Sequence, residues 1–208
     1  MIEARGYHRV DLTGQRAREI FVRSIISTPS GDPSGNAEAS TNIALQASRN
    51  PITAVSILAT GSSVGATTLL GILLDQQKMD MLRQLSESDP LTRNSTIFSP
   101  ESKVVCCIGV FFLSFFSLAQ SLRLFIHFSF FARAARYCAD HQDYYSAETS
   151  EVMFEDACKT CLRAQTYMSI GFRFLYCFIP AAFWLMGGTF LFGASLMTVV
   201  ALWNLDQI

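Results

Sequence analysis

Residues 52–74 read ITAVSILATGSSVGATTLLGILL, a run of 23 positions without a charged side chain. At about 1.5 Å per residue, a helix of this length crosses the roughly 30 Å hydrocarbon core of a bilayer. Small side chains dominate the run, and Gly61 and Gly65 form a GxxxG pair. Such a pair lets a neighbouring helix approach closely, so we expect this helix to pack against protein on more than one side.

Three further stretches carry most of the remaining Leu, Ile, Val and Phe, at residues 104–131, 168–186 and 189–204. Pro180 and the pair Gly187-Gly188 interrupt the last apolar block, which favours two helices; one strongly kinked helix is the alternative. The sequence therefore predicts an all-α, polytopic helical membrane protein with three to four transmembrane helices.

The remaining segments are polar. Residues 1–50 form a predicted N-terminal arm, in which residues 11–27 have the pattern of an amphipathic helix at the membrane surface. Residues 28–42 are rich in Ser, Pro, Gly and Asn and predict a loop, whereas residues 75–102 predict a polar connector. Residues 51–208 make up the predicted helical membrane domain.

Charge patterning indicates an orientation but no compartment. Six arginines lie in the arm and four Lys or Arg lie in residues 132–167, against three in the connector, so the positive-inside rule places the first two segments on one cytoplasm-like side. A net charge of −1 argues against nucleic acid as a partner. Arginines in the arm suggest organellar targeting, although acidic residues there argue against it; an organelle inner membrane (mitochondrial or plastid) is our working interpretation.

A short polar stripe runs along the apolar segment 104–131. At about 100° per residue, Ser114, Ser117 and Ser121 fall within a narrow arc. Polar groups that face lipid are costly, so we expect this arc to pack against protein or to face water. Four further polar residues lie in or near the predicted spans: Gln120, Arg123, His127 and Arg173. They suggest a polar path or a partner contact, and the alternative is that the arginines snorkel to lipid headgroups.

Two patterns of catalytic or metal-binding type have simpler explanations. Gly61 to Gly65 match the GxSxG pattern with Ser63 at its centre, but a nucleophile elbow requires a strand-turn-helix context that this helical run does not offer. Four residues have the types and spacing of a tetrahedral zinc site: Cys138, His141, Cys158 and Cys161. Helical packing or a disulfide would also explain the cysteines. We therefore predict no enzyme activity, no metal and no cofactor, with bound lipids as the expected ligands.

Three motifs in order resemble a known family. The first is Arg49-Asn50 ahead of the small-residue span, and the second is Gln120-Ser121-Leu122-Arg123 with His127 and Phe130. The third is Gly171-Phe172-Arg173-Phe174-Leu175-Tyr176, followed by Pro180, Trp184, Gly187 and Leu205-Asp206. Together they resemble the motifs of a family called domain of unknown function 599, whose members are membrane proteins of plants and bacteria. The resemblance covers roughly residues 15–206 and implies a helical membrane fold without implying an activity. It also implies a further span ahead of the amphipathic segment, which this sequence lacks, and a Gly-Pro where Gly187-Gly188 stands.

We predict an accessory or structural subunit of a larger membrane protein complex, with other membrane protein subunits and lipids as its partners. The small-residue span, the serine stripe and the polar arms favour this function. The alternative is a homo-oligomeric transporter or channel component whose polar path is lined by Gln120, Arg123, His127 and Arg173.

Overall fold

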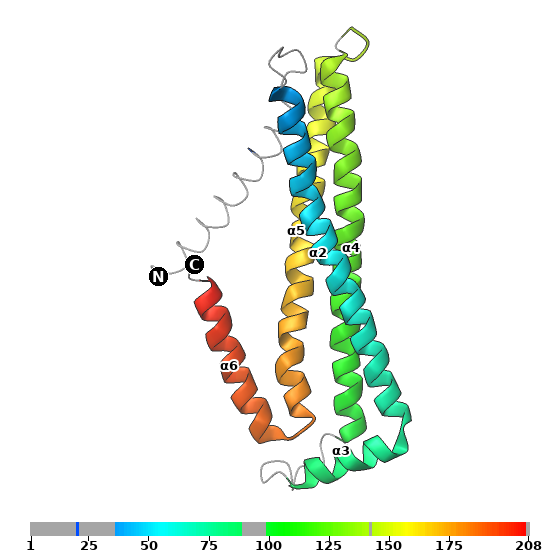
Figure 1. Ribbon diagram of the computed structural model, residues 1–208, viewed down its shortest axis with the longest axis vertical. Coiled ribbons are helices and arrows are strands. Elements are labelled where there is room, and N and C mark those ends of the chain that lie inside the picture. The colour runs from blue at the N-terminus through cyan, green and yellow to red at the C-terminus, as the bar shows by residue number, and fades with distance from the viewer. Residues whose placement is uncertain (1–19, 21–35, 89–98, 142, 207–208) are drawn as a thin grey trace. The chain divides into compact units, whose positions relative to one another are not determined.

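The computed structural model describes residue 20 and residues 36–88, 99–141 and 143–206. Every secondary-structure element in this part of the chain is helical, which confirms the all-α prediction. The helices are α2 (Asn36–Leu74), α3 (Gln76–Ser88), α4 (Pro100–Asp140), α5 (Ala147–Trp184) and α6 (Gly188–Asp206) (Figure 1). The predicted amphipathic helix at 11–27 lies outside the described residues, apart from Ile20.

The chain folds into two compact units, and three long helices contribute to both. The first unit combines α2 up to Ser56, α4 from Gln120 and α5 up to Tyr167. The second unit contains the rest of these helices together with α3 and α6.

The buried side of α2 is built from small residues. Its buried positions recur at intervals of four and three, which is the period of one helix face: Val55, Ala59, Ser62, Ala66 and Leu69. Because most of these side chains are small, a neighbouring helix can pack close to the backbone of α2.

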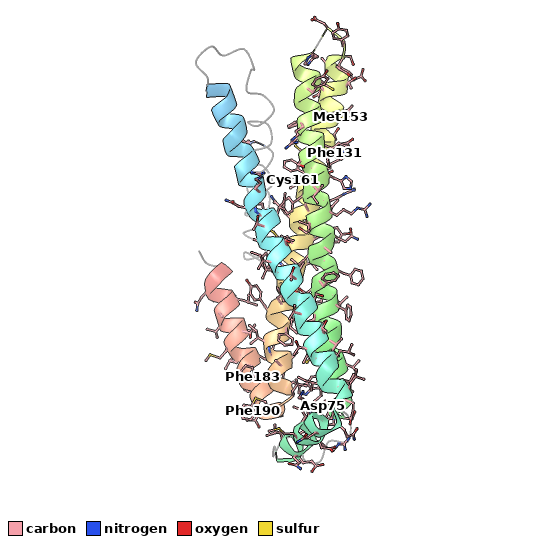
Figure 2. The ribbon with its side chains drawn as sticks, turned by 45° about the vertical axis from the view of Figure 1, so that its right-hand side comes forward. Asp75, Phe131, Met153, Cys161, Phe183 and Phe190 are labelled. Carbon is pink, nitrogen blue, oxygen red and sulfur yellow. The ribbon has the colours of Figure 1, made fainter. Side chains whose placement is uncertain are left out.

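Each unit has its own apolar core. In the second unit, Ala66 and Leu69 of α2 pack with Met79 of α3 and with Val104 and Phe111 of α4. The Phe111 ring also contacts Phe178 of α5, with 4.0 Å between ring centroids. In the first unit, Phe128 of α4 packs with Ala157 and Cys161 of α5, and Phe131 adds to this cluster (Figure 2).

Helix α2 begins earlier than the sequence suggested. Residues 36–42 were expected to belong to a loop, but they form the first two turns of α2. Ala37, Glu38 and Ala39 in this segment are good helix formers, and further alanines follow at positions 44 and 47. The predicted boundary near residue 50 therefore falls inside a continuous helix.

The predicted polar connector contains helix α3. Asp75 separates this helix from α2, and its Oδ1 atom accepts hydrogen bonds from the backbone N–H groups of Gln77 and Lys78 at 3.1 and 3.3 Å. Asp75 is thus the N-cap of α3. The hydrogen bond from the Lys78 side chain holds the pKa of the Asp75 carboxyl below its usual value.

The last apolar block forms two helices, as the favoured alternative predicted. Pro180 does not interrupt the block, because it lies within α5, which ends at Trp184. The break comes at Gly187, whose φ of 151° is rarely adopted by residues with a side chain. Phe183 and Phe190 lie on the two sides of this turn (Figure 2).

In the described part of the chain, one segment of α2 and one of α4 are long and apolar enough to cross a membrane. They are Arg49–Leu74 and Pro100–Ala135, which overlap the predicted spans at 52–74 and 104–131. The apolar part of α6, Gly188–Asn204, is shorter. The predicted spans at 168–186 and 189–204 stay predictions.

Candidate functional site

Buried serines join the helices of the second unit. Ser114 of α4 is fully buried, and its hydroxyl donates a 3.0 Å hydrogen bond to the carbonyl oxygen of Gly171 in α5. The Ser62 hydroxyl of α2 lies 3.4 Å from that of Ser114 and donates to the carbonyl of Leu58 in its own helix. Each hydroxyl proton therefore has an acceptor inside the protein.

Glycines near these buried serines let the helices approach closely. A Cβ atom on Gly171 would lie 2.7 Å from the Cγ atom of Leu118, and one on Gly65 would lie 2.6 Å from the Cζ atom of Phe111. Gly61 has open space around it. Of the predicted GxxxG pair, only Gly65 makes a close contact among the described residues.

A third buried serine lies in the first unit. Ser121 of α4 is fully buried and donates a 2.7 Å hydrogen bond to the carbonyl oxygen of Ala164 in α5. Ser117, between the two buried serines in sequence, is half-buried. The arc that the sequence singled out therefore carries two hydroxyls that bond to the backbone of α5.

The four candidate polar residues lie elsewhere. Gln120, Arg123 and His127 follow one another at spacings of three and four on the exposed surface of α4, within the first unit. Arg173 is exposed on α5, within the second unit.

The candidate zinc ligands do not form a site. Cys138 and Cys161 are buried, whereas His141 is exposed and its ring stacks on Tyr137 with 4.2 Å between centroids. Across the described ranges, no group of three or more His, Cys, Asp or Glu residues is arranged to hold a metal ion. The structure pairs none of the six cysteines, all of which lie in its described part, in a disulfide. Ser63 is an exposed residue of helix α2, outside any strand-turn-helix context.

The sequence did not point to Lys103, which is 2 % exposed. Its Nζ atom donates a 2.9 Å hydrogen bond to the Ser86 hydroxyl of α3 and lies 5.8 Å from the centroid of the Trp184 ring of α5. Lysine is unfavourable in the first turn of a helix, where the helix dipole is positive. The position of Lys103, three residues after Pro100, was therefore the one local signal that this lysine contacts another part of the chain.

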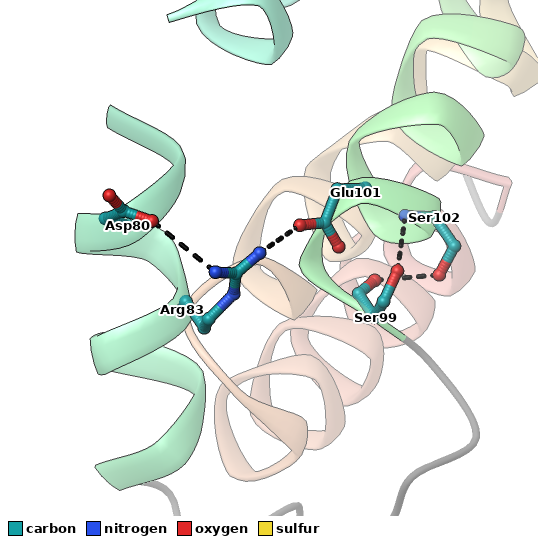
Figure 3. A network of polar contacts seen from close by, with 5 residues as sticks. All are labelled: Asp80, Arg83, Ser99, Glu101 and Ser102. Atoms are coloured by element: carbon teal, nitrogen blue, oxygen red, sulfur yellow. Dashed lines mark hydrogen bonds and ion pairs between the residues drawn. The ribbon is translucent and has the colours of Figure 1, made fainter. Parts of the chain in front are cut away.

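An ion pair adds to this junction between α3 and α4 (Figure 3). The Arg83 guanidinium donates a 2.5 Å hydrogen bond to Oε1 of Glu101, and its Nη1 atom lies 3.5 Å from Oδ1 of Asp80. The hydrogen bond to Glu101 raises the pKa of Arg83 above its ordinary value. Ser99 caps α4, because its Oγ atom accepts a 3.3 Å hydrogen bond from the backbone N–H of Ser102. Together these contacts fix α3 to the start of α4.

Comparison with known proteins agrees with the motif resemblance. The family model described as a protein of unknown function, DUF599, matches residues 15–208. No curated protein and no solved structure matches the chain. Because the matched region covers nearly the whole sequence, this chain belongs to the DUF599 family.

Proposed function

We propose that this chain is an integral membrane protein without catalytic activity and that it acts as an accessory or structural subunit of a larger membrane protein complex. The observation that carries the membrane assignment is the composition of α6. No charged residue occurs between Arg173 and Asp206, and large apolar side chains on α6 are strongly exposed, among them Phe192, Met197 and Trp203. A helix of a soluble protein would present a polar face here, whereas a helix that is apolar all round suits a lipid environment.

The exposed surface of α4 supports the same setting. Phe112, Leu113 and Phe116 are each more than half exposed on a helix that is long and apolar enough to cross a membrane. Apolar area of this extent is stable in contact with lipid and unfavourable in water.

The way the polar groups are used supports the proposed role as a subunit. The hydroxyls of Ser114 and Ser121 donate to carbonyls of α5 and so join two helices, and the Ser62 hydroxyl donates to a carbonyl of its own helix. Their protons are therefore used within the chain. Gln120, Arg123 and His127 instead lie on the exposed surface of α4. Polar side chains within a membrane usually face protein or water, so a partner chain that covers this surface would stabilise them.

The alternative function rests on the same surface. In a homo-oligomeric transporter or channel, copies of Gln120, Arg123 and His127 would line a shared polar path, to which Arg173 would contribute. This alternative requires a symmetric assembly of one chain, whereas the subunit function requires unlike partners.

Two experiments test the proposal. The native membrane is first washed with alkaline carbonate, and the chain should stay in the pellet; release into the wash would contradict the membrane assignment. A tagged chain carrying Arg123→Ala is then compared with Arg163→Ala for the partners that co-purify in mild detergent. Arg163 is an exposed arginine of α5 in the same unit and serves as a matched control. Loss of unlike partners from Arg123→Ala alone would support the proposal, and an unchanged partner set in both variants would contradict it.

A further inference from the structure

We infer that α3 lies flat in the membrane–water interface and that one of its flanks, formed by Met81 and Leu85, inserts among lipid acyl chains. This inference rests on the proposed function, because it requires α2 and α4 to cross the membrane. It assigns a lipid-binding surface to a segment that the sequence presented as a polar connector.

The position of α3 in the fold is the first argument. A single residue, Asp75, separates α3 from the end of α2, and the far end of α3 leads to α4, so α3 links two helices that each suit a membrane span. Helix α3 runs crosswise at the ends of α2 and α4 (Figure 1). Met79 belongs to the core cluster with Val104, and Leu82 packs against that cluster. The inner side of α3 therefore rests on the ends of the two apolar helices.

The second argument is the distribution of side chains around α3. Met81 and Leu85 are one turn apart on one flank, and they are 64 % and 39 % exposed. Arg83 and Glu87 lie two positions further along, about 200° around the helix, on an exposed charged flank. Lys78 precedes Met81 by one turn on the same flank, where its ammonium pairs with the Asp75 carboxylate at 2.9 Å. The apolar part of this flank is therefore the second half of α3. A helix with an apolar strip, charged residues around it and a low overall hydrophobicity is typical of the membrane interface.

The third argument is that α3 is held in this rotation. Asp75 caps its first turn, Arg83 pairs with Glu101, and Lys103 donates to Ser86. These contacts involve the start, middle and end of the helix, and they favour the rotation of α3 in which Met79 and Leu82, and not Met81 and Leu85, face the core. The Lys103 amino group also lies near Trp184, and both residue types are common where a membrane meets water.

The size of the flank favours lipid over protein as its occupant. A stable protein interface buries about 800 Å² on each partner, far more than two side chains provide. Insertion of an interfacial helix by roughly 5–10 Å requires only such a narrow apolar strip. Leu74, the last residue of α2, is 79 % exposed beside the junction and adds apolar surface there.

The test uses added tryptophans in the full chain, reconstituted into vesicles whose lipids carry bromine on the upper acyl chain. Met81→Trp and Leu85→Trp probe the apolar flank, and Gln84→Trp is the matched control next to Leu85 on the exposed outer side. The native Trp184 and Trp203 give the same background in all three variants. We expect shorter-wavelength emission and additional quenching by brominated lipid for Met81→Trp and Leu85→Trp, and neither change for Gln84→Trp.

Two results of the quenching test would overturn the inference. They would leave the proposed function intact as long as the chain is retained in carbonate-washed membranes. Equal quenching at positions 84 and 85 would show that α3 does not distinguish lipid from water. Emission at shorter wavelength without quenching by brominated lipid would show that protein covers the flank. Release of the chain by carbonate would instead overturn the membrane assignment and the inference together.

Discussion

The hydroxyl of Ser121 donates a 2.7 Å hydrogen bond to the carbonyl oxygen of Ala164, and this fully buried contact joins α4 to α5. The donor comes from the segment that is apolar enough to cross a membrane, and the acceptor is a backbone group of the neighbouring helix. A short polar contact of this kind fixes the pairing of two helices that otherwise present apolar surfaces to each other.

Ser121→Ala should lower the free energy of unfolding by about 0.5–1.5 kcal/mol, because it removes a buried interhelical hydrogen bond. Unfolding of the detergent-solubilised chain in a denaturing detergent, followed by circular dichroism, measures this change. Ser129→Ala is the control, since the Ser129 hydroxyl bonds to Ile126 within its own helix. An equal loss in both variants would contradict a specific role for the bond between Ser121 and Ala164.

Gly171→Ala should destabilise the protein by about 1–3 kcal/mol, because the added methyl group would overlap the Leu118 side chain and force it to move. Gly61→Ala should have no cost or should stabilise α2 by up to about 1 kcal/mol, because space is open around Gly61 and alanine is the better helix former. Thermal unfolding of both variants in one detergent tests the contrast. A larger loss from Gly61→Ala than from Gly171→Ala would show that the helix contacts are placed wrongly.

Lys103 and Ser86 should show energetic coupling of about 1.5 kcal/mol or more, as expected for a hydrogen bond to a charged group. The double-mutant cycle uses Lys103→Met, which keeps most of the apolar stem, and Ser86→Ala. Unfolding free energies of the two single variants and the double variant give the coupling. Additive effects would indicate that the two side chains do not depend on each other.

The N-cap of α3 should weaken in acid. The folded pKa of Asp75 is lowered by its hydrogen bond with Lys78, so its contribution is present above the unfolded pKa of about 3.9 and is lost as the pH falls through the lower folded value. The rate of backbone amide hydrogen exchange in the first turn of α3 should therefore rise at low pH. The rise is measured as the ratio of this rate in the unchanged protein to the rate in Asp75→Asn at the same pH. A constant ratio between the two proteins from pH 6 to pH 2 would contradict the role of the charged cap.

Much of the fold was predictable, because it follows from residues close together in sequence. Apolar runs predicted the helices, and the arc of Ser114 and Ser121 follows from helical periodicity alone. The break at Gly187 was predictable because glycine tolerates a backbone that other residues avoid. Pro180 was misinterpreted, since a helix can continue through a proline when its surroundings support it.

The missed features depend on partners that are distant in sequence. The burial of Lys103 requires Ser86 on α3 and Trp184 at the end of α5, and no local pattern connects these three residues. The difference between Gly61 and Gly65 likewise depends on which side of α2 faces Phe111. The spacing of the glycines could not distinguish the two.

The most direct test of the central claim is the native mass of the assembly that contains this chain. The native membrane is extracted in mild detergent, and the species carrying the chain are sized and weighed by native mass spectrometry. We predict a large assembly in which this chain and unlike membrane proteins occur in fixed stoichiometry. A species composed of this chain alone would contradict the subunit function, and a symmetric oligomer would then favour the transporter or channel alternative.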